Sequence, residues 1–234
     1  MSRAARYWVV VPAAGIGARF ASETPKQYAS LAGASVLEHA LKPLFIHPKL
    51  HAVVIALAPN DEHFAKLEFT QHGTQLEQVE GGGSRAQSVL NGLQFLQGKA
   101  KQNDFVLVHD AARPCLQAAE IDDLLAASED EAVGAILALP MNDTVKRVVG
   151  QQIVETVDRT ALWRAVTPQM FRFGVLFDAL TSALAANFET TDEASAVERL
   201  GLTVNIVEAK ASNIKITRQE DVSIAESLLS LERG

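Results

Sequence analysis

Runs of apolar residues of strand length alternate along this chain with amphipathic stretches of helix length. Several of these runs are apolar almost throughout, as expected of strands that are buried on both faces of a sheet. The expected strands are Tyr7–Val11, His51–Ala58, Leu76–Val79, Phe105–His109, Ala132–Leu139 and Thr203–Val207.

The stretches between these runs have the spacing of helices. Ser35–Ile46 begins with a capping box, in which Ser35 is followed three residues later by Glu38. The other expected helices are Ser84–Leu96, Ile121–Ala127, Gly174–Ala186, a shorter one from Asp192 and a last one from Arg218. This order predicts an α/β protein with a mainly parallel sheet and helices on both faces.

One segment departs from this pattern. Asp143–Val149 and Gln152–Val157 alternate polar and apolar residues on either side of a Val-Gly-Gln-Gln turn. Such alternation indicates a β-hairpin, here an insertion at about residues 140–160, rather than a buried parallel strand. The hairpin could project as an arm or serve only as a structural flap. Since no linker or change of composition divides the sequence, we expect one domain over residues 1–234.

Composition excludes several classes of function. The formal charge is −7, which argues against broad binding to nucleic acids or to anionic membranes. The single cysteine, Cys115, excludes an internal disulfide and is typical of a reducing compartment. The apolar run Tyr7–Val11 is too short for a secretory signal or a membrane span. We therefore expect a soluble, cytoplasmic protein.

A glycine-rich loop, PAAGIGARFASETPKQY, follows the first expected strand. In α/β sheets such loops bind phosphate groups. The dinucleotide fingerprint G-x-G-x-x-G fails here, because Gly15 and Gly17 are present but Phe20 takes the third place. The run G-x-x-x-x-G-K-[ST] of a P-loop does not occur either.

The loop carries other features that suit a nucleotide. Arg19 and Lys26 can flank a polyphosphate with two positive charges, and the small side chains of Ala13 and Ala14 leave room for a flat base. The alternative is a solvated turn that carries two ordinary surface cations.

The chain contains a series of further motifs in a fixed order. They are PAAGIGARF and PKQY in the loop, GGGSRAQSVLNGL (81–93), VLVHDAARP (106–114), DTVKR (143–147), TVDR (156–159), LWRAVTPQ (162–169), TDEAS (191–195) and NIKIT (213–217). In this order they resemble the 2-C-methyl-D-erythritol 4-phosphate cytidylyltransferases of isoprenoid biosynthesis. The loop and HDAARP are shared with ribitol-5-phosphate cytidylyltransferases, so these two motifs indicate the superfamily rather than the substrate.

The resemblance implies a Rossmann-like fold with a protruding β-hairpin arm for dimerisation. It also implies transfer of CMP from CTP to 2-C-methyl-D-erythritol 4-phosphate, with Mg²⁺ or another divalent cation held mainly by the triphosphate. The catalytic residues that it implies are Arg19, Lys26, Arg159 and Lys215. The nucleotide-binding residues would be Pro12, Ala13, Ala14, Gly15, Gly82 and Ser88. The substrate-binding residues would be Asp110, Arg113, Thr144, Thr167 and Thr191. Asp110 could also lie near the metal, and arms exchanged within a homodimer would bring Thr144 and Arg159 to the substrate phosphate of the partner.

Some of these residues also have a purely structural interpretation. Ser88 could bond only to its own backbone, and Arg113 could simply pair with Asp110. Thr191 could simply belong to the start of a helix, because Thr190 and Glu193 have capping-box spacing. Lys215 could be a solvated charge at the edge of a strand.

The sequence also departs from many relatives. Ala18 stands where they have a second arginine, and Gly83, Gln87 and Ser212 stand where acidic residues are frequent. We expect these differences to tune loops rather than to abolish the chemistry.

Two other functions stay open besides transfer to methylerythritol phosphate. One is the same chemistry on another polyol phosphate, such as ribitol 5-phosphate. The other is a nucleotide-binding regulator without turnover, which could lose the cations. The presence of all four cations, Arg19, Lys26, Arg159 and Lys215, argues against a regulator.

Overall fold

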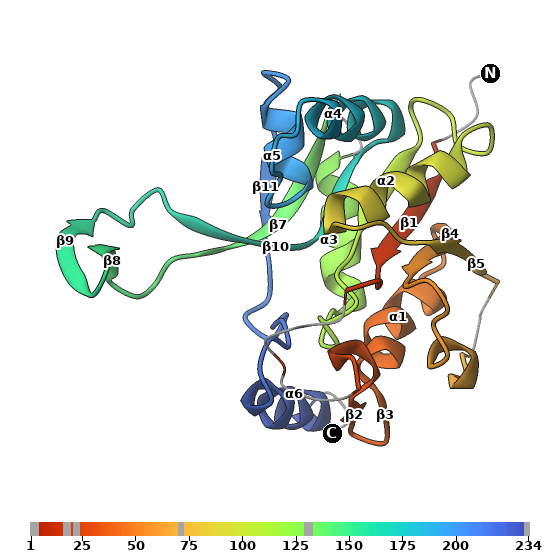
Figure 1. Cartoon of the computed structure of the whole chain (residues 1–234), viewed down its shortest axis with the longest axis horizontal. Helices are drawn as coiled ribbons and strands as arrows, with labels where there is room; N and C mark the ends of the chain where they lie inside the picture. The colour runs from red at the N-terminus through yellow and green to blue at the C-terminus, as the bar shows by residue number, and fades with distance from the viewer. Residues whose placement is uncertain (1–4, 16–19, 21–23, 70–72, 129–132, 232–234) are drawn as a thin grey trace.

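A computed structural model of the chain describes residues 5–15, 20, 24–69, 73–128 and 133–231 (Figure 1). Its centre is a seven-stranded sheet in the order β11-β7-β10-β6-β1-β4-β5. In that order the strands are Asn205–Glu208, Gly134–Pro140, Trp163–Arg172, Phe105–Val108, Tyr7–Pro12, Leu50–Leu57 and Gln75–Glu80. Only β10 runs antiparallel to its neighbours within this sheet, so the expected mainly parallel arrangement is confirmed.

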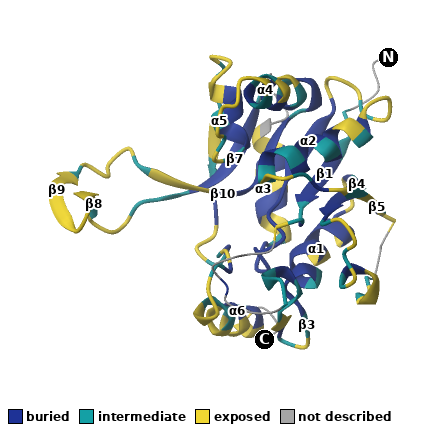
Figure 2. Ribbon diagram, in the orientation of Figure 1, coloured by how far each residue is buried: buried dark blue, intermediate teal, exposed yellow. Residues whose placement is uncertain are grey.

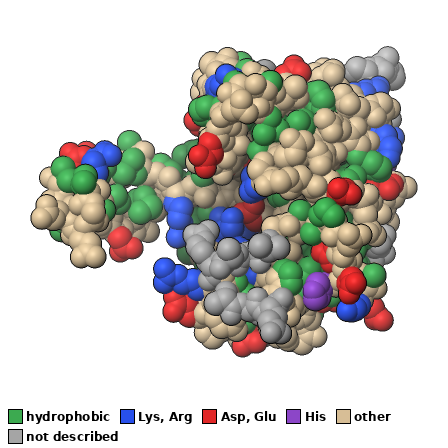
Figure 3. All heavy atoms as spheres, in the orientation of Figure 1, with side chains coloured by type: hydrophobic (Ala, Val, Ile, Leu, Met, Phe, Trp, Pro, Cys, Tyr) green, Lys and Arg blue, Asp and Glu red, His purple; other side chains and the backbone are tan. Residues whose placement is uncertain are grey.

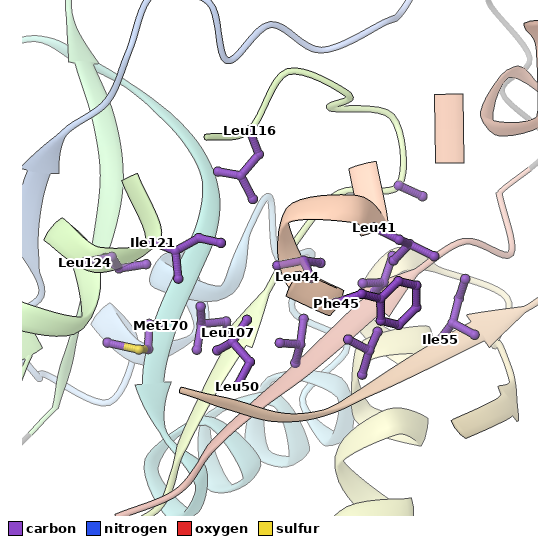
Figure 4. Close-up of a cluster of buried hydrophobic side chains, with 14 of the residues drawn as sticks. Leu41, Leu44, Phe45, Leu50, Ile55, Leu107, Leu116, Ile121, Leu124 and Met170 are labelled. Carbon is purple, nitrogen blue, oxygen red and sulfur yellow. The ribbon is translucent and has the colours of Figure 1, made fainter. Parts of the chain in front are cut away.

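Helices cover both faces of the sheet. Successive side chains of β1 point to opposite faces, with Val9 and Val11 on one side and Trp8 and Val10 on the other. Helices α1 (Val36–Ile46) and α3 (Ala118–Ser128) pack on the first face, where Figure 4 shows their leucines and isoleucine against strand residues. The second face carries α2 (Arg85–Leu96), α4 (Phe173–Ala185) and α5 (Glu193–Glu198). The two layers of apolar contacts fix the strand ends that carry the polar residues described below.

A smaller apolar cluster joins the C-terminal segment to the N-terminal part of the chain. Ile216 packs there with residues of α6 (Glu220–Leu231) and with Leu31 of β2 (Ser30–Leu31), the short strand that pairs with β3 (Ala34–Ser35). Two 3-10 turns, η1 (Lys26–Tyr28) and η2 (Phe64–Lys66), complete the described elements. Every helix in the described ranges falls short of the length and apolarity that a membrane crossing needs.

The start of α1 follows from its sequence. The Ser35 hydroxyl accepts a hydrogen bond from the Glu38 N–H at 3.1 Å, and the Glu38 carboxylate accepts one from the Ser35 N–H at 2.7 Å. This reciprocal pair is the expected capping box, which satisfies two N–H groups that would otherwise lack partners at the helix start.

Strand β10 was not predicted from the sequence. It lies between β6 and β7, with Gln169 opposite Val108 and Trp163 opposite Pro140. Polar Arg164, Thr167 and Gln169 interrupt its apolar residues, so no continuous run signals a central strand. Its register against β7 is irregular between Ala165 and Gln169, which is where its polar side chains reach the carboxyl edge of the parallel strands.

The predicted hairpin is present. Strands β8 (Val145–Val149) and β9 (Gln152–Val157) pair antiparallel and continue from β7 and β10 (Figure 1). They extend away from the body of the molecule, and almost all of their residues are exposed (Figure 2). The insertion is therefore an arm rather than a flap that lies on the body.

Candidate active site

A cavity of about 450 Å³ lies at the carboxyl ends of the parallel strands. The loop after β1, the glycine turn before α2 and the residues after β6 contribute to its wall. Its lining residues are Pro12, Ala13, Ala14, Gly15, Lys26, Gln27, Gly82, Gly83, Ser84, Arg85, Ser88, Asp110, Ala111, Ala112 and Lys215. The six residues expected to bind the nucleotide all belong to this set.

The loop after β1 is held by a buried side chain. The Gln27 amide Nε2 donates to the carbonyl of Ala13 at 2.8 Å and to that of Gly15 at 3.2 Å. The Ala13 N–H donates in turn to the carbonyl of Ala56 on β4 at 2.8 Å. These bonds fix the backbone that faces the cavity. Arg19, the other expected cation of this loop, lies outside the described residues.

The glycine turn before α2 is closely packed against that loop. A side chain at Gly81 would place its Cβ 2.4 Å from the Cβ of Ala14, so only glycine fits this approach. The Ser88 hydroxyl accepts from the Gly82 N–H at 3.0 Å and donates to the Ser84 carbonyl at 2.9 Å. Ser88 thus bonds to its own backbone, as the structural interpretation expected, and it also holds the turn that lines the cavity.

The two lysines of the cavity come from opposite ends of the chain. The Lys26 Nζ donates to the carbonyl of Ile216 at 3.1 Å. The Ile216 N–H donates to the carbonyl of Ala112 at 2.8 Å, so the segment around Lys215 is fixed beside the end of β6. That segment has no strand pairing, and the expectation of a strand there was wrong. Backbone and lysine contacts hold it in place instead of a sheet ladder.

A network of charges separates this cavity from a second one. The Asp110 carboxylate contacts the Lys215 Nζ at 2.7 Å, the Arg85 Nε at 3.0 Å and the Arg113 Nε at 3.6 Å. Burial would raise the pKa of Asp110, but the charges of Arg85, Lys215 and Arg113 outweigh burial and hold this pKa well below its ordinary value. Asp110 is therefore ionised, and the expected pairing with Arg113 is confirmed.

Arg85 and Glu193 belong to this network but were not predicted. Their side chains form a two-pronged pair, with the Arg85 Nη1 and Nη2 donating to the two carboxylate oxygens of Glu193 at 2.6 and 3.1 Å. One signal in the sequence could have pointed to Arg85. It occupies the first turn of α2, where a positive charge opposes the helix dipole unless a carboxylate offsets it.

The second cavity has a volume of about 280 Å³ and lies on the other side of this network. Its lining residues are Arg85, Asp110, Arg113, Ala165, Val166, Thr167, Gln169, Thr191, Asp192 and Lys215. Four of the five residues expected to bind the acceptor are thus brought together. Thr144 and Arg159 are exposed on the arm, and neither is among the residues that line these two cavities.

A buried hydrogen-bond chain supports Asp110 from behind. Burial lowers the pKa of His109 to about 4, so its ring is neutral at pH 7. The ring Nε2 lies 3.2 Å from the carbonyl oxygen of Arg113, which can only accept, so Nε2 carries the hydrogen. The Nδ1 atom then accepts from the Thr167 hydroxyl at 3.1 Å, and that hydroxyl accepts from the Asp110 N–H at 3.0 Å.

Asn213 ties the Lys215 segment to the same wall. Its side-chain amide donates to the carbonyl of Thr167 at 3.0 Å, and its main-chain carbonyl accepts from the Arg113 Nη1 at 2.8 Å. Asn213 is buried, as are both of these partners. The position of Lys215 is thus set by residues of β10 and of the loop after β6.

The start of α5 differs from the expected capping box. Asp192, not Thr190, caps the helix, and its carboxylate accepts from the Ser195 N–H at 2.9 Å while the Ser195 hydroxyl reaches back to the Asp192 backbone. Glu193 is then free to pair with Arg85. The Gln169 side chain holds the same turn, because its amide donates to Asp192 at 2.8 Å and its oxygen accepts from the Ala194 N–H at 3.0 Å.

Few side chains on these walls are free to ligate a metal ion. Both oxygens of the Asp110 carboxylate already face cations, with Arg85 on one and Lys215 and Arg113 on the other. Within the described ranges, no group of three or more His, Cys, Asp or Glu side chains has an arrangement that could hold a metal. Figure 3 shows Lys and Arg side chains gathered on this face near the root of the arm. The Lys and Arg donors on these walls are therefore suited to binding anions.

Residues 7–231 match the family model of 2-C-methyl-D-erythritol 4-phosphate cytidylyltransferase. The chain is 48% identical over 218 residues to the enzyme of that name from Pseudomonas syringae pv. syringae, with 92% of both chains covered. It is 46% identical over 225 residues to that from Vibrio vulnificus, covering 96% of this chain and 94% of the relative.

Solved structures give the same result. A crystal structure of a 4-diphosphocytidyl-2C-methyl-D-erythritol synthase is 37% identical with a TM-score of 0.83, covering 97% of this chain and all of that one (100%). The Francisella tularensis 2-C-methyl-D-erythritol 4-phosphate cytidylyltransferase is 34% identical with a TM-score of 0.82, covering 96% of this chain and 100% of that one.

Proposed function

The chain belongs to the 2-C-methyl-D-erythritol 4-phosphate cytidylyltransferase family, and we propose that its two adjacent cavities hold the two substrates of that reaction. It is a CTP-dependent cytidylyltransferase of isoprenoid precursor biosynthesis. It transfers CMP from CTP to 2-C-methyl-D-erythritol 4-phosphate, which gives 4-diphosphocytidyl-2-C-methyl-D-erythritol and pyrophosphate. Transfer to ribitol 5-phosphate and a role without turnover are not favoured, because the relatives are named for methylerythritol phosphate.

One observation carries the assignment of the two cavities. Arg85, Asp110 and Lys215 line both of them, so the cavities meet at a shared wall of charged side chains. A nucleotide in the first cavity and a phosphorylated polyol in the second would meet at that wall. Adjacent cavities that share cations suit a reaction between two anions.

The reaction needs cations more than it needs a base. The second pKa of a phosphate ester is about 6, so the attacking oxygen is already ionised at pH 7. Two unit charges of the same sign at 4 Å repel each other by about 4 kcal/mol at an effective dielectric constant of 20. The cations must therefore offset the repulsion between the acceptor phosphate and the triphosphate, and must stabilise the charge that develops at the α-phosphorus.

We assign the first cavity to CTP. Fixed backbone groups at Pro12, Ala13 and Ala14, with Gly15 and Gly82 in the same wall, suit the reading of a cytosine, because their donors and acceptors cannot rotate away. Ser88 supports this wall through the Gly82 N–H. Lys26, together with Arg19 of the same loop, would hold the triphosphate, and Lys215 would lie beside the reacting phosphates.

We assign the second cavity to the acceptor. The Asp110 carboxylate would accept hydrogen bonds from the methylerythritol hydroxyls, and the Thr191 hydroxyl could accept from them or donate to them. Arg113 would add positive charge near them. The Thr167 hydroxyl is already engaged by His109 and by the Asp110 N–H, so its contribution is to hold Asp110 as well as to line the wall.

The arm leads us to propose a homodimer. Four apolar side chains of the arm are exposed in the single chain, the most exposed being Val149 at 71% and the others Val148, Ile153 and Val154. Burying them against a second copy would remove apolar surface from water. In the same exchange, Thr144 and Arg159 would reach the substrate phosphate in the partner's second cavity. The rest of residues 1–234 would form one nucleotidyltransferase unit.

We propose that Mg²⁺ arrives on the triphosphate of CTP. The Asp110 carboxylate would have to release a cation to ligate it, so the phosphate oxygens are better ligands. Bound there, Mg²⁺ would neutralise charge on the triphosphate. A single buried cysteine, Cys115, suits the reducing conditions of the cytoplasm, where we place the enzyme.

Pyrophosphate release is the direct test. The protein is supplied with CTP, Mg²⁺ and 2-C-methyl-D-erythritol 4-phosphate, with ribitol 5-phosphate as the alternative acceptor and ATP, GTP and UTP as alternative donors. We expect release only with CTP and methylerythritol phosphate, and none after chelation of the metal. Release only with ribitol 5-phosphate would overturn the substrate, and folded protein that binds CTP without any release would overturn catalysis.

A further inference from the structure

Arg85 occupies the wall between the two cavities, yet its charge is directed at the protein. Its Nε donates to the Asp110 carboxylate at 3.0 Å, and its Nη1 and Nη2 donate to the two oxygens of Glu193 at 2.6 and 3.1 Å. Three of the five N–H groups of the guanidinium are thus committed to carboxylates. Two carboxylates face this one cation, so little of its charge is left for a phosphate.

Each member of this contact depends on the others. Glu193 and Asp110 are buried, and a buried carboxylate is costly unless it is paired and hydrogen-bonded. Burial lowers the pKa of Arg85, but the Glu193 and Asp110 carboxylates outweigh burial and hold this pKa above its ordinary value. Arg85 therefore stays charged, and the planar, two-pronged geometry fixes the angle between its partners.

The contact joins the two halves of the site. On one side, Arg85 follows Ser84, the N-cap of α2, in the turn whose Gly82 N–H is held by Ser88. On the other side, Glu193 follows Asp192, the N-cap of α5, and Thr191 of the second cavity precedes that cap. One guanidinium thus connects the turn that lines the first cavity with the helix start that lines the second.

We propose that Arg85 is a positioning residue, which acts through Glu193 and Asp110 to hold the acceptor cavity in register with the nucleotide cavity. This inference rests on the proposed function, because it takes the second cavity as the acceptor site. The Glu193 carboxylate is equally part of it, although it lines neither cavity. Asp110 receives its orientation from Arg85 in front and from Thr167 behind.

A direct role in phosphate binding makes a different prediction. If Arg85 served as a free cation, Arg85→Lys would keep most of its effect, and Glu193→Gln would release the guanidinium toward the phosphates. If Arg85 positions the walls, both variants lose the two-pronged charged contact and both harm the acceptor side. Glu193→Gln is the decisive variant, because it keeps the size of the side chain while it removes the charge and one of the two oxygens that accept from Arg85.

The experiment compares Arg85→Lys, Glu193→Gln and the double variant with wild-type enzyme. The exposed pair Arg218 and Glu220 supplies matched controls, Arg218→Lys and Glu220→Gln. Steady-state kinetics give the KM for each substrate and kcat, calorimetry gives the Kd for CTP alone, and thermal melts show that each variant is folded. A shift of about 1 Å in a reacting group can cost up to about a hundredfold.

We expect Arg85→Lys and Glu193→Gln each to raise the KM for methylerythritol phosphate by about tenfold or more, with the CTP Kd changed less than about threefold. The double variant should be no worse than the more affected single one, because both remove the same contact. An unchanged or lower acceptor KM in Glu193→Gln, or an equal loss of CTP binding, would overturn the inference. Wild-type enzyme without turnover would instead overturn the proposed function.

Discussion

The wall between the cavities and the arm use the same pair of residue types in opposite environments. In the wall, the side chains of Arg85 and Glu193 are 31% and 1% exposed. On the arm, Arg147 and Glu155 also form an ion pair, but their side chains are 63% and 51% exposed. A buried carboxylate that loses its partner is left uncompensated, whereas an exposed one is simply solvated. The positions of the charged side chains in the wall are thus fixed before any ligand binds.

The apolar residues show the same contrast. Within the sheet they pack in two closed layers, whereas the valines and the isoleucine of the arm face water (Figure 2). A two-stranded hairpin has little stability of its own, so the arm needs a surface to pack against. The first cavity is built by one chain, while the second receives the proposed contribution of Thr144 and Arg159 only from another copy.

The largest expected effect comes from removing the charge at the centre of the wall. Asp110→Asn leaves Arg85, Arg113 and Lys215 without their common partner, and Arg113 is itself buried. Breaking a buried pair in this way costs about 3–5 kcal/mol. Denaturant unfolding should show a loss of that order, and a loss below about 1 kcal/mol would mean that the wall behaves like the arm.

The next effect is a pH dependence that originates behind the wall. The pKa of His109 is about 4 in the folded chain and would be about 6.5 when unfolded, so protonation favours unfolding. The contribution of the neutral His109 ring to the free energy of unfolding is fully present above pH 6.5. It is lost as the pH falls toward 4, by up to about 3 kcal/mol. Unfolding free energies measured across this window should fall more steeply in wild type than in His109→Gln, and equal slopes would contradict the assignment.

A third prediction separates catalysis from stability. Lys26 lines the first cavity, and its Nζ donates to the carbonyl of Ile216. We expect its removal to affect turnover more than folding. Lys26→Ala should lower kcat by about 10²-fold or more, because it removes positive charge from the transferring phosphoryl group. Lys66→Ala, an exposed lysine in another 3-10 turn, is the matched control. A kcat near that of wild type would refute the role given to Lys26.

The smallest effect is expected on the arm. Glu155→Gln removes the charge that pairs with Arg147, but both groups remain solvated in the single chain. The unfolding free energy should change by less than about 1 kcal/mol. A loss as large as that of Asp110→Asn would show that burial does not explain the difference between the two regions.

Hydrophobic patterning predicted most of the fold. Strands β1, β4 and β6, the capping box of α1 and the hairpin follow from periodicity and from local hydrogen bonding, which act within a few residues. Strand β10 could not be predicted in this way, because its polar residues serve the site edge and its burial comes from the two neighbouring strands. The lack of a strand around Lys215 has the same origin, since contacts from distant residues hold that segment.

The site was predicted only in part. Residues of local motifs, such as Ala13, Gly82 and Ser88, lie together on the wall of the first cavity, and their role in binding the nucleotide stays a prediction. Arg85 and Glu193 are separated by more than a hundred residues, and their pairing depends on how α2 and α5 pack. The correct cap of α5, Asp192, would have indicated that Glu193 was free for another partner.

Mixing two inactive variants tests most directly the claim that the arm of one subunit completes the active site of the other subunit in a dimer. Arg159→Ala removes the cation that the arm is proposed to supply to the partner's site, and Lys26→Ala removes a cation of the first cavity, so each variant alone should have little activity. After subunit exchange of an equal mixture, half of the dimers would be mixed and one of their two sites intact, which predicts about a quarter of wild-type activity. Mass spectrometry verifies that the subunits have exchanged. If activity then fails to recover, the account is contradicted, because each site would be built within one chain.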